Sequence, residues 1–90
     1  MIQFEWDNEK AKQNHRKHGV SFEEAASVFY DPLSATFNDP DHSIGELRFI
    51  TVGYSSQERL LVISYTERGH KIRIISARPA TAHERKRHES

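Results

Sequence analysis

Two segments near the start of the chain have the residue pattern of helices. Residues 8–18 contain no Pro, Gly or β-branched residue. Asp7 before them can accept hydrogen bonds from the free amides of a first helical turn, and Gly19 after them suits a left-handed C-cap. In the second segment, Ser21 with Glu24 predicts a capping box. Its apolar residues recur at i, i+3, i+4 and i+7, a stripe that would pack on a sheet: Phe22, Ala25, Ala26 and Phe29.

The apolar pattern changes after Pro32 to the alternation that strands show. A short strand is predicted at 33–37, and another at 4–6, before the first helix. Three longer β-rich runs follow at the spacing of an antiparallel meander: 47–54, 60–66 and 71–78. Unbroken alternation in the last run would place four residues on one face of the sheet: Ile72, Ile74, Ser76 and Arg78.

A short basic helix is predicted at the C-terminal end, because Thr81 and Glu84 form a second capping box. The complete order predicts an α+β fold. We expect an antiparallel β-meander sheet, two N-terminal helices packed on it and a short C-terminal helix. The chain has the size of one domain, which we expect to span 1–90.

Composition excludes several classes of protein. The chain has no cysteine, which excludes a disulfide framework and a cysteine-ligated zinc site, and no apolar run has the length of a membrane span. Residues 1–7 lack a signal-peptide pattern, so we expect a cytoplasmic protein.

A formal net charge of zero argues against a nucleic-acid binder. However, the charges are not evenly distributed: residues 20–67 carry two basic and eight acidic residues, whereas residues 68–90 carry seven basic and two acidic residues. The C-terminal end is therefore basic, and a nucleic acid could bind there. The alternative is that these charges only form a face exposed to solvent.

Four arginines lie inside or beside predicted strands, where β-propensity does not favour them: Arg48, Arg59, Arg73 and Arg78. A guanidinium offers a planar fork of donors that matches phosphate oxygens. Arginines at strand ends beside an apolar centre would form a cationic rim, as a shallow phosphate site on a sheet requires. The alternative is that these charges protect strand edges from aggregation.

Histidines supply candidates for proton transfer near neutral pH. His15 and His18 share a helix face beside Lys17, and His88 lies in the predicted terminal helix. Spacing of i, i+3 gives a metal two ligands at most, so we expect no metal site. His18 also suits the C-terminal end of a helix dipole, which is a structural explanation for it. Glu46 is either a general base or an ion-pair partner of Arg48 or Arg59.

A succession of short motifs covers nearly the whole chain. It includes Phe4-Glu5-Trp6-Asp7, Lys17-His18-Gly19-Val20-Ser21-Phe22, Val28-Phe29-Tyr30-Asp31-Pro32, Tyr65-Thr66-Glu67-Arg68-Gly69 and Ile72-Arg73-Ile74-Ile75-Ser76-Ala77-Arg78. In this order and spacing, the chain resembles the BrnT-like toxins of type II toxin–antitoxin systems.

The resemblance implies a compact RelE-like fold and a metal-independent endoribonuclease that halts translation without a cofactor. It also implies a BrnA-like ribbon-helix-helix antitoxin, which blocks the toxin and through which the complex contacts operator DNA. The catalytic positions would be Lys17, His18, Glu46, Arg48, Arg59 and Arg78. We expect Arg73, Arg85 and His88 to bind RNA, with His88 standing where the family often has a tyrosine.

Two other functions compete with the ribonuclease. One is a non-catalytic module that binds protein or nucleic acid in transcriptional autoregulation. The other is a degenerate toxin that keeps only the surface for its antitoxin. Production of the protein alone in a bacterial host separates an active toxin from both.

Overall fold

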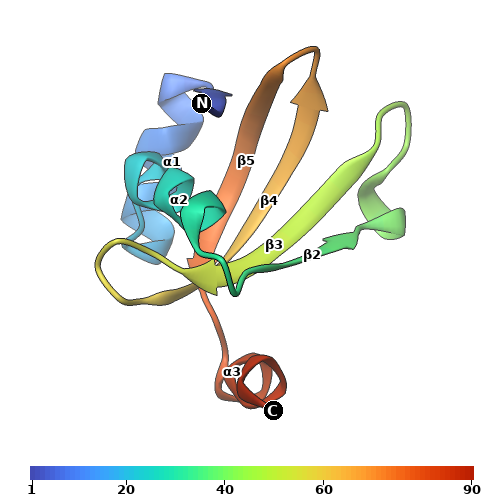
Figure 1. The fold of residues 1–90 in the computed structure, drawn as a ribbon. Helices are drawn as coiled ribbons and strands as arrows, with labels where there is room; N and C mark the ends of the chain where they lie inside the picture. Colours follow the sequence, from blue (N-terminus) through green and yellow to red (C-terminus); the bar gives the residue numbers. More distant parts are fainter.

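A five-stranded sheet forms the centre of the computed structural model, which describes residues 1–90 (Figure 1). Its strands are β1 Gln3–Glu5, β2 Ala35–Asn38, β3 Arg48–Tyr54, β4 Leu60–Arg68 and β5 Lys71–Pro79, in the spatial order β1-β5-β4-β3-β2. The helices are α1 Asn8–His18, α2 Phe22–Ser27 and α3 Ala82–Glu89, with 3₁₀ turns at Val28–Tyr30 and Pro40–His42. None of them is long and apolar enough to cross a membrane.

The sheet is mixed, which corrects the prediction of an antiparallel sheet. β1 pairs in parallel with β5, where Glu5 lies opposite Arg73, whereas the other three pairings are antiparallel as predicted. The parallel pair joins the two ends of the chain, and α1 and α2 lie between them in sequence. Local periodicity carries no information about such a distant partner, so the sequence pattern could not reveal it.

The helix ends lie where the predicted capping residues place them. Asp7 accepts hydrogen bonds from the Glu9 and Lys10 amides, and Gly19 ends α1 with a left-handed φ of 69°. The capping box of α2 is only half formed. The Ser21 hydroxyl accepts from the Glu24 amide at 3.0 Å, but the Glu24 side chain bonds other partners and does not return the contact.

The core lies between the first two helices and one face of the sheet, as Figure 1 shows. It consists of Val20, Phe22, Ala25 and Val28 packed against Leu61, Ile63, Ile74 and Ala77, all of them buried. Aromatic rings extend it: Trp6 meets Phe22 edge-on, and Tyr65 packs against Phe29 and Phe49. These rings are packing elements, as expected of aromatic residues in a small domain.

A β-bulge interrupts β5, so the predicted alternation along this strand is wrong. Ser64 lies opposite Ser76 while Tyr65 lies opposite Ile74, which leaves Ile75 as the extra residue. Ile74 and Ala77 consequently both face the core, although they are three positions apart. Because the bulge reverses the alternation, Arg78 faces away from the core instead of sharing a face with Ile74.

Asn14 holds β5 where β1 ends. The pairing with β1 stops at Arg73, so the outer backbone groups of Ala77 lack a strand partner. The buried Asn14 side chain replaces it: its oxygen accepts from the Ala77 amide at 3.1 Å, and its nitrogen donates to the Ala77 carbonyl at 2.8 Å. The same nitrogen donates to the Val20 carbonyl at 3.0 Å. One side chain thus fixes the position of α1, its following loop and β5.

Candidate nucleic-acid interface

The sheet face opposite α1 and α2 carries three rows of side chains, and we call it the open face. The pairing of β2 to β5, with β1 at the edge, defines the rows. The upper row is Arg48, Thr66, Arg73 and Glu5. The middle row is Phe37, Ile50, Ser64 and Ser76, and the lower row is Ala35, Val52, Val62 and Arg78. Arg48 and Arg73 therefore lie at one end of a largely apolar surface and Arg78 at the other, while the fourth arginine of the predicted rim, Arg59, does not lie on this face.

Arg48 has no anionic partner in the upper row. Its neighbour Arg73 donates to Glu5 at 2.7 Å, and the Thr66 hydroxyl donates to the Leu47 carbonyl at 2.7 Å. Arg48 forms no ion pair, and its Nε is buried without a hydrogen-bond partner. A buried guanidinium donor normally has an acceptor. The capacity of Arg48 to bind an anion lies at its two terminal nitrogens, which donate no hydrogen bond, because Nε is covered by protein atoms.

Arg78, at the other end of the open face, holds the terminal helix. Its guanidinium donates to both carboxylate oxygens of Glu84, at 2.7 and 2.8 Å. These hydrogen bonds lower the pKa of Glu84 to about 2, so the carboxylate is charged at neutral pH. Glu84 also completes the predicted capping box with Thr81. Arg78 thus joins β5 to α3, and Glu84 occupies the fork that a phosphate would use.

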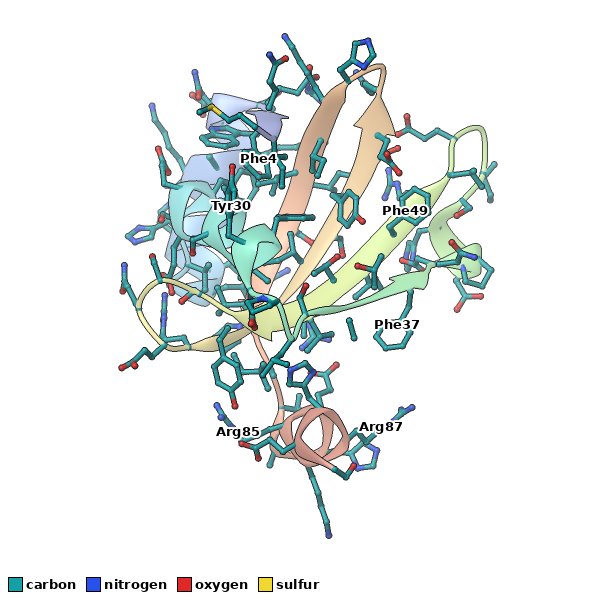
Figure 2. All side chains as sticks on the ribbon, viewed as in Figure 1. Phe4, Tyr30, Phe37, Phe49, Arg85 and Arg87 are labelled. Atoms are coloured by element: carbon teal, nitrogen blue, oxygen red, sulfur yellow. The ribbon has the colours of Figure 1, made fainter.

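The terminal helix α3 forms one wall of a groove on the open face. It has no fully buried residue, and only Glu84 and His88 are partly buried. The His88 ring meets the Tyr54 ring at 6.0 Å, and the Tyr54 hydroxyl donates to Glu89 at 3.1 Å. The groove has a volume of about 440 Å³ and is lined by Leu33, Ala35, Phe37, Ile50, Val52, Val62, Arg78, Glu84, Arg87 and His88. Figure 2 shows Phe37 pointing from β2 to the side of the sheet where α3 and Arg87 lie.

Arg59 lies apart from the other strand arginines, on the side of the core. Its Nε donates to the buried Glu24 carboxylate at 2.9 Å, and its Nη2 donates to the same group and to the Gly19 carbonyl. The Ser55 hydroxyl donates to Glu24 at 2.7 Å. The hydrogen bond from Arg59, and then that from Ser55, lowers the pKa of Glu24. Arg59 therefore joins α2 and the end of α1 to the start of β4, and the structure does not bring it to Arg48 or Arg78.

Replacement of Arg59 by alanine tests this structural role. We expect Arg59→Ala to lower the free energy of unfolding by about 2 kcal/mol, since it leaves the Glu24 charge buried, while the 39% exposure of Arg59 reduces the loss. Urea denaturation measures it. Combining Arg59→Ala with Glu24→Gln should restore part of the loss, because no unpaired charge remains. A stable Arg59→Ala protein that cleaves no RNA would instead place Arg59 in the reaction.

The other predicted site residues lie away from the open face. Lys17 and His18 end α1, which packs on the opposite face of the sheet. His15 lines a second groove of about 360 Å³ between α1 and α2. Glu46 lies 3.7 Å from Arg68 near the far end of the β-meander and pairs with neither Arg48 nor Arg59. No group of three His, Asp or Glu side chains is placed to hold a metal ion.

Arg87 is a groove residue that the sequence reasoning missed. The signal for it was available, because the capping box at Thr81 fixes the start of α3. Helical spacing then places three residues on one face of this helix, the face that lines the groove: Glu84, Arg87 and His88. Arg85 lies on a different side of α3, as Figure 2 shows.

Comparisons with known proteins agree with this architecture. The family model described as "Ribonuclease toxin, BrnT, of type II toxin-antitoxin system" matches residues 6–84. Among solved structures, the crystal structure of the Brucella abortus ribonuclease toxin BrnT is similar, with a TM-score of 0.70 over 90% of this chain and 99% of that one. Its sequence identity of 19% shows a shared fold alone. Curated protein sequences give no match. From the family match over most of its length, the chain belongs to the BrnT family of ribonuclease toxins of type II toxin–antitoxin systems.

Proposed function

We propose that the protein is an endoribonuclease whose open face binds the RNA strand that it cleaves. The observation that carries this proposal is the unpartnered, partly buried guanidinium of Arg48, beside Arg73 on a sheet face that α1 and α2 leave uncovered. Membership of a ribonuclease family supports the same reaction. A phosphate is the RNA group that such a fork binds best.

The two ends of the open face suit successive parts of an RNA strand. The rows of Arg48 and Arg78 are four residues apart along the strands, or about 13 Å. Arg48 and Arg73 would hold one phosphate of the strand, and the phosphate under attack would lie at the other end, beside His88. Arg87 would bind the backbone at this end, because it lines the groove from α3 while Glu84 already fills the fork of Arg78.

The proposed chemistry is internal transesterification and uses no metal or cofactor. A base removes the 2′-hydroxyl proton, and the 2′ oxygen forms a bond to phosphorus. The bond from phosphorus to the 5′ oxygen breaks, and an acid gives that oxygen a proton. Products are a 2′,3′-cyclic phosphate and a 5′-hydroxyl. Arg87 would stabilise the added charge on the phosphorane, and His88 is the histidine placed to transfer a proton, because both side chains line the groove from α3.

This assignment divides the residues that the resemblance implies. Arg48, Arg73, Arg78 and His88 belong to the proposed RNA site together with Arg87, whereas Arg85 lies on another side of α3. Lys17, His18 and Arg59 act outside it, and Glu46 lies beyond its upper end. Inside the cell, we propose that cleavage stops translation in the cytoplasm and that a BrnA-like ribbon-helix-helix antitoxin neutralises the protein and contacts operator DNA.

Induction of the protein alone in a bacterial host tests the activity. We expect growth arrest and RNA fragments with 2′,3′-cyclic phosphate ends, which purified protein also produces in a buffer containing a chelator. A soluble protein that leaves both growth and RNA unchanged would contradict the proposal. It would favour a non-catalytic binding module.

Replacement of His88 by glutamine tests the proposed proton transfer. We expect His88→Gln to lower the cleavage rate about 100-fold, the usual contribution of one acid–base group. His83→Gln is the matched control, since His83 is an exposed histidine of the same helix outside the groove. Both variants should unfold at the wild-type temperature. A fully active His88→Gln protein together with an inactive His18→Gln protein would move the reaction to the end of α1.

A further inference from the structure

We propose that the apolar part of the groove is the docking surface for the antitoxin. Its occupant would be a segment that presents apolar side chains to β2 and acidic side chains to α3. This inference rests on the proposed function in one respect, that the protein is a toxin neutralised by a protein partner. It assigns that partner a place on this chain.

Exposed apolar side chains mark this surface. Leu33 is 75% exposed and Phe37 is 54% exposed, and both line the groove. They lie on and before β2, which is an edge strand of the sheet. Val52 and Val62 continue the apolar surface inward along the lower row. Contiguous apolar side chains exposed to water are characteristic of protein interfaces.

Charge selects the kind of partner. Arg87 and His88 line the groove from α3, and Arg78 lines it from the end of β5. The Glu84 carboxylate is already paired with Arg78, so the excess charge of this wall is positive. A partner with carboxylates beside its apolar side chains would therefore be attracted and oriented. RNA carries the same negative charge, but it offers no aliphatic groups for Leu33.

A second copy of this chain fits the groove less well. The common symmetric dimer brings the same patch of both copies together. Two basic α3 walls would then face each other, and their like charges would repel. An acidic, apolar antitoxin segment satisfies both parts of the groove. It would also cover Arg78 and His88, so the docking surface explains how binding would neutralise the toxin.

Calorimetric titration of the toxin with the antitoxin of its own locus tests the proposal. We expect Leu33→Ser and Phe37→Ser each to raise the Kd about tenfold, the loss for one buried apolar side chain, and the double variant to raise it about 100-fold. Ile44→Ser and Leu47→Ser are matched controls, because these side chains are 92% and 69% exposed but lie outside the groove. The controls should bind within about twofold of wild type. RNA cleavage should be unchanged in the Leu33→Ser, Ile44→Ser and Leu47→Ser proteins, and thermal unfolding should be unchanged in all four single variants.

Three results would overturn the proposal. The first is an unchanged Kd for the double variant. The second is a wild-type dimer in light scattering that Phe37→Ser converts to a monomer, which would show that a second copy occupies the groove. The third is loss of RNA cleavage by folded Leu33→Ser protein, which would assign the apolar groove to RNA. Failure of the proposed ribonuclease activity can be distinguished from failure of the docking surface. If the protein cleaves no RNA but the groove variants still weaken antitoxin binding, the docking surface is supported and the ribonuclease proposal is not.

Discussion

Replacing Arg48 with alanine is expected to lower kcat/KM for RNA cleavage by about 10–100-fold, the usual effect of removing one charged hydrogen-bonding contact with the bound RNA backbone. Arg48 forms no ion pair, so its removal leaves no carboxylate unpaired on the open face. Its Nε has no hydrogen-bond partner that the folded protein would lose. The loss should therefore be one of activity, with the unfolding temperature close to that of wild type.

Two further variants make this result specific. Arg48→Lys keeps the charge but not the planar fork, and we expect activity between the alanine variant and wild type. Arg68→Ala removes an arginine that is 53% exposed and loosely paired with Glu46, so cleavage should change by less than about twofold. Initial rates on a defined oligoribonucleotide measure all three. An Arg48→Ala protein with wild-type kcat/KM would contradict the assignment of this arginine to RNA.

Replacing Asn14 with alanine is expected to lower the free energy of unfolding by about 3 kcal/mol. The substitution removes three hydrogen bonds and leaves buried backbone groups of Ala77 and Val20 without partners, and each such group costs about 1–3 kcal/mol. For a domain of this size, the melting temperature should fall by about 12–24 °C. Scanning calorimetry measures this shift.

The exposed neighbour Gln13 provides the control for Asn14. It lies on the same helix and is exposed, so Gln13→Ala should change the free energy of unfolding by less than about 0.5 kcal/mol. Asn14→Asp would place a buried carboxylate against the carbonyl oxygens of Ala77 and Val20, so we expect a stability no higher than that of Asn14→Ala. A loss below about 1 kcal/mol for Asn14→Ala would mean that water or another side chain replaces the amide.

Local signals account for the parts of the fold that sequence predicted well. Asp7 and Gly19 bracket α1 because a helix leaves free amides at its start and needs a left-handed residue at its end, and both requirements concern adjacent residues. The same holds for the capping box at Thr81 and for the apolar stripe of α2. The sequence also singled out the arginines of the open face, because charged residues are uncommon in strands and their presence there indicates a specific role.

The remainder depends on contacts between residues far apart in the chain. The pairing of β1 with β5 and the contact of Asn14 with Ala77 join positions about sixty or more residues apart, and neither leaves a local pattern. Arg59 and Arg48 look alike in sequence. They differ only because one meets the buried Glu24 carboxylate and the other meets no carboxylate. The partner of a charged residue decides its role, and the partner is a property of the fold.

The bulge in β5 has a consequence for the alignment of distant relatives. Ile75 is an extra residue in the strand, so the alternation between the two faces is reversed after it. Even-numbered residues such as Ile74 face the core before the bulge, and the odd-numbered Ala77 faces it afterwards. A relative that lacks the extra residue would need its gap inside the strand, at Ile75, to bring an arginine into equivalence with Arg78. A gap moved to the loop after the strand would align that arginine with Ala77, which is buried in the core. For relatives as distant as 19% identity, an alignment of this strand must therefore establish whether the extra residue is present before it assigns an equivalent of Arg78.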